Sequence, residues 1–185
     1  MVELNYKQGL LKSSISCLRN GRISLFSFRN IDLLRDTETI IKFRRDSYSI
    51  SFGDESLFGD NDSYLKKIFE RLIKFPGGLV IVEIDGKQVG QVELQIKQFE
   101  NKEIGYVNLF YLISEYRGKG YGAKLIEFAE RFFREYGVNA YQLRVSPTNK
   151  RAIRFYQKNG FDVLKIEDED TVPRFRMYKL LSTSS

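Results

Sequence analysis

The residues best suited to chemistry in this chain are residues 117–122, which read Arg-Gly-Lys-Gly-Tyr-Gly. They follow the apolar run 107–113 and precede a strongly amphipathic stretch with helical spacing. Glycines let the backbone approach an anion, and the first turn of a helix offers N–H groups that have no partner in the chain. The helix dipole and two cationic side chains add positive charge. We therefore predict a pyrophosphate-binding loop made of Arg117, Gly118, Lys119, Gly120, Tyr121 and Gly122.

Three other interpretations of this loop compete. A P-loop requires Ser or Thr after Gly-Lys, but Gly120 follows Lys119, so that interpretation fails. The dinucleotide pattern G-x-G-x-x-A fits Gly118, Gly120 and Ala123. That pattern also requires a parallel βαβ start and an acidic residue after the next strand, whereas hairpin strands precede the loop and residues 143–145 read Leu-Arg-Val. The last interpretation is a glycine turn without a ligand, which leaves the three glycines and two cations unexplained.

The composition limits the class of protein. A chain of 185 residues is long enough for one domain with a proper core, and we expect an N-terminal extension over 1–22 followed by a single domain over 23–185. Cys17 is the only cysteine, so no internal disulfide forms. The absence of histidine excludes a histidine-based catalytic triad or zinc site, and we predict no metal site. The net charge of +6 fits an anionic ligand or nucleic acid, or serves solubility alone.

Membrane and export signals are absent from the pattern of apolar residues. No apolar run is long enough to span a bilayer, and the N-terminus lacks the apolar core of a signal peptide. The cytoplasm is therefore the expected location. The sequence leaves the oligomeric state open, a homodimer included.

Hydrophobic periodicity predicts a mixed sheet with helices on its faces. We expect a strand over 23–28, a helix from Asp32 to about residue 45, a loop over 48–61, and a helix capped by Asp60 or Asp62. A strand at 79–84 and a return strand that includes 89–97 join through an Asp85-Gly86 turn, and a third strand ends at 113. The glycine loop, a helix to Gly137, and further elements at 140–146, 147–159, 161–166 and 173–180 complete the order β-α-α-β-β-β-α-β-α-β-β.

The second strand of that hairpin alternates cleanly between apolar and polar residues. Its apolar residues are expected to face the core and its polar ones the solvent, namely Gln91, Glu93, Gln95 and Lys97. Gly90 interrupts the alternation and is a candidate for a β-bulge.

Two motifs together resemble the GNAT superfamily of acyl-CoA-dependent N-acetyltransferases. Residues 117–122 match the signature [Q/R]-x-x-G-x-[G/A], and residues 149–161 resemble the family pattern N-x-x-A-x-x-x-Y-x-x-x-G-F. The predicted order of elements matches the family fold from roughly Ile23 to Leu180. The resemblance implies a mostly antiparallel α/β sheet that splays between two central strands, with helices on both faces.

The resemblance also implies how acetyl-CoA binds. The pantetheine arm of acetyl-CoA would lie between strands 108–113 and 141–145, with backbone groups of Leu112 and Ile113 as partners. The glycine loop would bind the pyrophosphate, and Asn149 would contact the cofactor arm, unless Asn149 serves only as a helix N-terminal residue. Tyr156 matches the family's general acid, because a phenol can protonate a departing thiolate; otherwise it is a half-buried core aromatic.

The general base is less well defined by the sequence. The central-strand position that often carries a glutamate in this family falls near Tyr106, with Asn108 beyond it, and neither is an effective base. Glu93 on the neighbouring strand is the best candidate, although it equally fits a solvated strand face, and Glu103 is weaker. We expect proton removal through water.

The acceptor is expected to be an amine, small or within a peptide. If the loops at 48–61 and 167–170 line the acceptor cleft, their carboxylates would favour a small cationic amine. A non-catalytic acetyl-CoA-binding module is the alternative function. Nucleic-acid binding is disfavoured because the basic residues are scattered or assigned to the loop.

Overall fold

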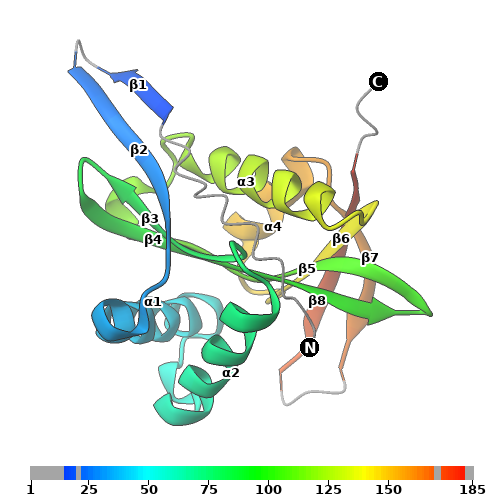
Figure 1. Cartoon of the computed structure of the whole chain (residues 1–185). Helices are drawn as coiled ribbons and strands as arrows, with labels where there is room; N and C mark the ends of the chain where they lie inside the picture. The colour runs from blue at the N-terminus through cyan, green and yellow to red at the C-terminus, as the bar shows by residue number, and fades with distance from the viewer. Residues whose placement is uncertain (1–14, 20–21, 169–171, 182–185) are drawn as a thin grey trace, which may run out of the picture.

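The computed structural model describes residues 15–19, 22–168 and 172–181, and their strands form one eight-stranded sheet (Figure 1). The strand order is β1-β2-β3-β4-β5-β6-β8-β7. The strands are β1 (Ile15–Arg19), β2 (Arg22–Asn30), β3 (Leu79–Ile84), β4 (Lys87–Phe99), β5 (Lys102–Leu112), β6 (Ala140–Val145), β7 (Asp162–Glu167) and β8 (Arg174–Leu180). All neighbouring pairs are antiparallel except β5 and β6, which are parallel.

Helices cover both faces of this sheet, as Figure 1 shows. The helices α1 (Leu33–Phe52) and α2 (Asn61–Lys74) lie on one face, and α3 (Tyr121–Glu135) and α4 (Lys150–Lys158) lie on the other. Short 3-10 helices occupy Glu55–Phe58 and Ser114–Tyr116. The predicted α/β architecture, a mixed and mostly antiparallel sheet between two layers of helices, is confirmed. No helix in the described part of the chain is long and apolar enough to cross a membrane.

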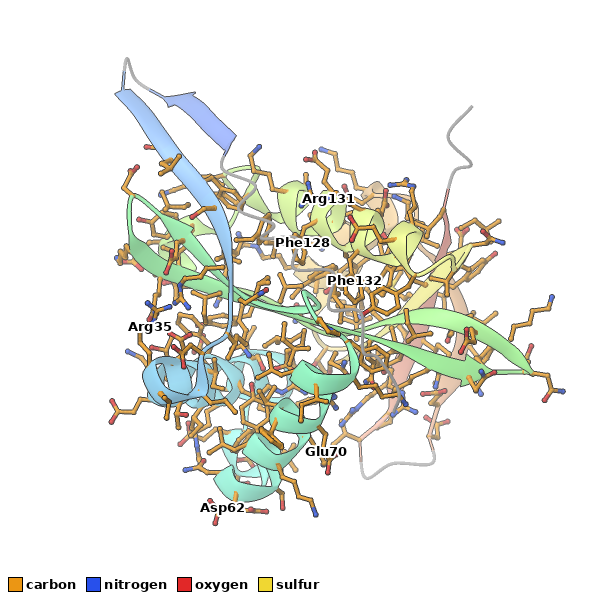
Figure 2. All side chains as sticks on the ribbon, in the orientation of Figure 1. Arg35, Asp62, Glu70, Phe128, Arg131 and Phe132 are labelled. Atoms are coloured by element: carbon orange, nitrogen blue, oxygen red, sulfur yellow. The ribbon has the colours of Figure 1, made fainter. Side chains whose placement is uncertain are left out.

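The larger core lies between the sheet and α3. Phe28 of β2 stacks on Phe128 of α3, with ring centroids 4.2 Å apart. Figure 2 shows Phe128 and Phe132 directed toward the sheet and Arg131 directed away from it. A second cluster packs Leu79 and Ile81 of β3 against α1 and α2. Burial of these apolar side chains supplies the main driving force for the fold.

This second cluster corrects the prediction for β4. Gln91 and Glu93 were expected to face solvent, yet both side chains are 0% exposed. They pair in register with Ile81 and Leu79 and lie beneath α1 and α2. Because both faces of the sheet are covered, the central part of β4 has no solvated face.

The boundaries of α1 and its following loop also differ from the prediction. The helix α1 continues to Phe52 rather than ending near residue 45, and it stops at Gly53, which has the left-handed φ of 75°. Asp60, one of the two predicted caps, accepts the N–H of Ser63 at the start of α2. The expected loop is therefore mostly helical. The predicted extension 1–22 includes β1, which pairs with β2; residues 1–14 and 20–21 lie outside the described part.

Two irregularities in strand register shape the centre of the sheet. Val89 is an extra residue in β4, beside the bulge expected at Gly90, where a Cβ would lie 2.3 Å from the carbonyl oxygen of Tyr111. In β5, Leu109 pairs with Glu93 and Val107 pairs with Leu94, so Asn108 is an extra residue. The parallel pairing of β5 with β6 covers only Gly105–Val107 and ends at the residue before Asn108.

Candidate active site

The glycine loop folds as an open turn that leads into α3. Gly118 and Gly120 have φ values of 74° and 86°, which favour glycine. Gly120 is the N-cap of α3, and no side chain caps this helix. Among the described residues, no hydrogen bond uses the backbone N–H groups of Gly118, Lys119, Gly120, Tyr121 or Gly122. Five consecutive donors, together with the helix dipole, fit an anion.

The third glycine of the loop has a different role. A Cβ on Gly122 would lie 2.8 Å from Cζ of Phe155, so this glycine lets α3 pack against α4. On the same helix α4, Arg151 places Nη2 3.1 Å from the Cβ position of Gly118. Sequence reasoning missed Arg151 as a cation of the loop, because only the folded chain brings α4 to this turn.

The side chain of Arg117 contacts the end of β5 and α1 and so holds the glycine loop against them. Its Nε donates to the carbonyl oxygen of Leu112 at 2.5 Å, and its Nη2 lies 3.2 Å from Asp46 of α1. Tyr121 is 6% exposed and stacks on Phe26, so only its backbone faces a ligand. The side chain of Lys119 lies over the ring of Tyr116.

The backbone groups of Leu112 and Ile113 already have partners within the chain. The Leu112 carbonyl accepts from Arg117, the Ile113 N–H donates to Val89, and the Ile113 carbonyl accepts the N–H of Tyr116. Each carbonyl oxygen retains a second lone pair. A contact of these residues with pantetheine stays a prediction and would use those lone pairs.

A cavity of about 430 Å³ opens where β5 and β6 stop pairing. Side chains from α1, α2, β4, β5, β6, α4 and β8 line this cavity. Asn108, the extra residue of β5, lies on its wall, and Gln95 donates to Oδ1 of Asn108 at 2.6 Å. Nδ2 of Asn108 is buried and has no partner in the described chain. A bulge commonly re-aims a side chain beside a site, and here it directs an amide at the cavity.

Asn149 and Tyr156 both line this cavity. Asn149 is the N-cap of α4, since its Oδ1 accepts the N–H of Ala152 at 3.1 Å, which confirms the helix-terminal interpretation. Its amide nitrogen remains for another partner. The ring of Tyr156 packs against Phe155 and Phe161 at 5.4 Å each.

The hydroxyl of Tyr156 makes no hydrogen bond among the described residues, and burial raises its pKa above the ordinary value. The phenol therefore stays protonated at physiological pH. The two interpretations of Tyr156, core aromatic and acid, are compatible because the ring is packed while the residue also lines the cavity.

Glu93 lies beside the cavity but is not among its lining residues. Oε1 accepts from Tyr64 at 2.8 Å and from Gln91 at 3.0 Å, and Oε2 accepts from Arg71 at 3.1 Å. The expectation of a solvated strand face is wrong for this residue, because α2 covers it. Its role as a base stays a prediction, and these contacts favour an indirect one.

The carboxylates expected to line an acceptor cleft lie elsewhere. Asp54 and Asp60 cap helices, and Glu167 binds Arg176 at 2.5 Å and Arg144 at 2.6 Å. Of the lining residues that the structure describes, none is acidic. Part of the late acidic run, residues 169–170, lies outside the described chain.

Comparison with known proteins gives the family. Residues 38–161 match the model of the acetyltransferase (GNAT) family. The chain therefore belongs to the GNAT family, in agreement with the resemblance of its two motifs.

Individual relatives agree with this class. An uncharacterized N-acetyltransferase of Archaeoglobus fulgidus is 39% identical over 82 residues, which cover 43% of this chain and 56% of the relative. The match thus spans about half the length of that relative. A spermidine N(1)-acetyltransferase of Thermoplasma acidophilum is 28% identical over 149 residues, 74% of this chain and 87% of the relative. A crystal structure of the NatC complex bound to Gag peptide and CoA contains a chain with the same fold, with a TM-score of 0.67 at 18% identity over 85% of this chain and 99% of that one.

Proposed function

We propose that this protein is an N-acetyltransferase that transfers the acetyl group of acetyl-CoA to a primary amine by direct attack in a ternary complex. The observation that carries the proposal is the run of five N–H groups at the start of α3 that have no partner among the described residues, together with the cavity at the β5–β6 gap that Tyr156 lines. Membership of the GNAT family and relatives that are named N-acetyltransferases support it.

The residues present fit coenzyme A. The space at Gly120 is open to 4 Å, the loop donors are unpaired, and Arg151 and Lys119 stand beside them for the pyrophosphate. The amide of Asn149 would hold the pantetheine arm, together with the carbonyl groups of Leu112 and Ile113. The chain of the NatC structure, which has this fold, is in a complex with CoA.

Acetyl-CoA, when bound, supplies an activated acetyl thioester. The C–N bond to the acceptor forms as the C–S bond breaks. The departing sulfur takes a proton, and the hydroxyl of Tyr156 lines the cavity, retains its proton and has no other partner among the described residues. Tyr156 is therefore the general acid in this proposal.

The acceptor must lose a proton before its nitrogen attacks. Because Glu93 does not line the cavity, we propose that water carries this proton away, with Glu93 holding Arg71 in place. Partial removal from water and the positive charges of Arg71, Arg144 and Arg176 lower the pKa of Lys97, which lines the cavity, to about 8. The same surroundings favour the neutral form of an acceptor amine and reduce the need for a carboxylate base.

A turnover screen tests the proposal. Acetyl-CoA is incubated with a panel of amines, and thiol release is measured beside calorimetric binding of acetyl-CoA. The variant Gly120→Glu should lose acetyl-CoA affinity, since it places a carboxylate among the loop donors. Gly137→Glu is the matched control: Gly137 follows the other end of α3, has a φ of 72° and is equally open. Binding without thiol release for any amine would favour a non-catalytic module, and no binding at all would refute both.

A further inference from the structure

The cavity beside Tyr156 carries a surplus of positive charge. Among the residues that the structure describes, six cationic side chains and no aspartate or glutamate line it: Arg44, Lys67, Arg71, Lys97, Arg144 and Arg174. Within the described ranges, two carboxylates reach these cations from outside the lining, Glu93 at Arg71 and Glu167 at Arg144. Glu167 is shared with Arg176 and Lys165, so it neutralises little of the charge in the cavity.

The phosphates of coenzyme A do not account for this surplus. The cations at the glycine loop are Arg117, Lys119 and Arg151, and none of them lines the cavity. The cavity cations come instead from α1, α2, β4, β6 and β8. The acetyl and pantetheine groups that would enter the cavity are uncharged and require no cation.

Four of the six cavity cations have no ion pair among the described residues, namely Arg44, Lys67, Lys97 and Arg174. Lys97 has no carboxylate within ion-pair distance, and its Nζ lies 3.9 Å from the centroid of the Tyr106 ring. Arg174 lies over the ring of Phe52, and its Nε is buried without a hydrogen-bond partner. The amide Nδ2 of Asn108 is also unpaired. All three groups are donors. Arg174 Nε and Asn108 Nδ2 are buried and require acceptors, whereas Lys97 is exposed and presents its charge at the cavity wall.

We infer that the acceptor is a small amine that carries an anionic oxygen group, a carboxylate or a phosphate, which Lys97 and Arg174 bind in the cavity that Tyr156 also lines. This inference rests on the proposed acetyltransferase function. It replaces the expectation of a cationic acceptor, because a second positive charge in this cavity meets repulsion from every side. A volume of about 430 Å³, shared with the thioester end of the cofactor, fits a molecule of amino-acid size.

The depressed pKa of Lys97 agrees with a missing anion. After partial removal from water, the neighbouring charges of Arg71, Arg144 and Arg176 are the main causes of the depression, and Glu167 opposes them. An anion bound at Lys97 stabilises the ammonium form and raises the pKa of this group. The pKa of Lys97 is therefore a direct readout of binding that requires no turnover.

The experiment compares paired amines in which one member carries an added anionic group. Ethanolamine is paired with O-phosphoethanolamine, phenethylamine with phenylalanine, and spermidine is the cationic arm. Thiol release from acetyl-CoA and calorimetric binding to the CoA-loaded protein are both measured. We expect kcat/KM to be about tenfold or more higher for the anionic member of a pair, as charge-assisted hydrogen bonds imply. The phosphate and carboxylate arms identify which group the cavity prefers.

Variants then connect the preference to Lys97. Lys97→Met should lower binding of the anionic amines about tenfold and leave the neutral amines little changed. Lys66→Met is the matched control, because Lys66 is an exposed lysine of α2 outside the lining. In the wild-type protein, NMR titration should show the Lys97 pKa rising when the anionic amine is added.

The outcomes separate the two levels of the proposal. If neutral amines or spermidine are acetylated while the anionic amines neither bind nor react, the acceptor inference is overturned and the acetyltransferase function stands. If anionic amines bind, lose affinity in Lys97→Met and raise the Lys97 pKa, the acceptor inference holds even where turnover is absent. If none of the anionic amines binds or shifts that pKa, the inference is wrong.

Discussion

The substitution Glu93→Gln distinguishes an anchor for Arg71 from a proton acceptor for the reaction. The Glu93 side chain is 0% exposed, and its Oε2 lies 3.1 Å from Nη1 of Arg71. A glutamine keeps the bond from Tyr64 but turns an amide donor toward the guanidinium, which then has no anion. Removing one member of a buried ion pair costs about 3–5 kcal/mol. Because the Arg71 side chain stays 21% exposed and water screens part of the loss, we expect about 2–3 kcal/mol.

Urea unfolding followed by circular dichroism measures this loss, in parallel with kcat/KM. If Glu93 is an anchor, the double variant Glu93→Gln with Arg71→Met loses less stability than the two single variants together. In that case we expect only a small change in kcat, which comes from the displacement of Arg71 in the cavity. The reasoning is refuted if Glu93→Gln loses less than about 0.5 kcal/mol while kcat falls about a hundredfold, because a base and not an anchor would behave in this way.

Three further predictions concern the acid, the loop and the pH dependence of stability. Tyr156→Phe should lower kcat about 10²- to 10⁴-fold and leave the calorimetric Kd for acetyl-CoA unchanged, and undiminished turnover would exclude Tyr156 as the acid. Gly122→Ala should lower the free energy of unfolding, measured in urea, by about 1–3 kcal/mol, because the new Cβ would lie 2.8 Å from the Phe155 ring. Adding Phe155→Leu should restore part of this loss, and no recovery would argue against the clash. Burial opposes the shift, but hydrogen bonds from Arg29 and the backbone lower the pKa of Asp36 below its ordinary 3.8. The stability that ionised Asp36 contributes is therefore present above about pH 4 and is lost as the pH falls through its folded-state pKa. In unfolding curves from pH 2 to 7, Asp36→Asn should lose less stability on acidification than the wild-type protein does. Equal losses would contradict this prediction.

The sequence predicted those parts of the site that depend on local residue order. The glycine loop could be placed between a strand and a helix because its φ requirements and its position before an amphipathic stretch are both local. The N-cap at Asn149 is local in the same way. The packing role of Gly122 could not be predicted, because Phe155 lies on another helix and only the fold brings the two together.

The errors in β4 have a non-local cause. The alternation of apolar and polar residues correctly separated the two faces of β4. It carries no information on whether α1 and α2 cover the face that bears the polar residues. Glu93 is therefore buried against Tyr64 and Arg71, two residues of α2 that are more than twenty positions away. The basic lining of the cavity was missed for the same reason, since its cations come from five elements and show no pattern in the chain.

The extra residue in β5 connects the fold to the chemistry. With Asn108 inserted, the strand leaves its pairing with β6 directly after Val107. The carbonyl oxygen of Asn108 accepts from Nη1 of Arg44 at 2.9 Å, and Gln95 fixes its side-chain amide. A polar group exposed by the separation of two strands normally needs a strand or water as its partner. Because side chains of α1 and β4 satisfy the carbonyl oxygen and Oδ1 of Asn108 instead, the gap between the strands is preformed, and binding would not have to separate the strands first.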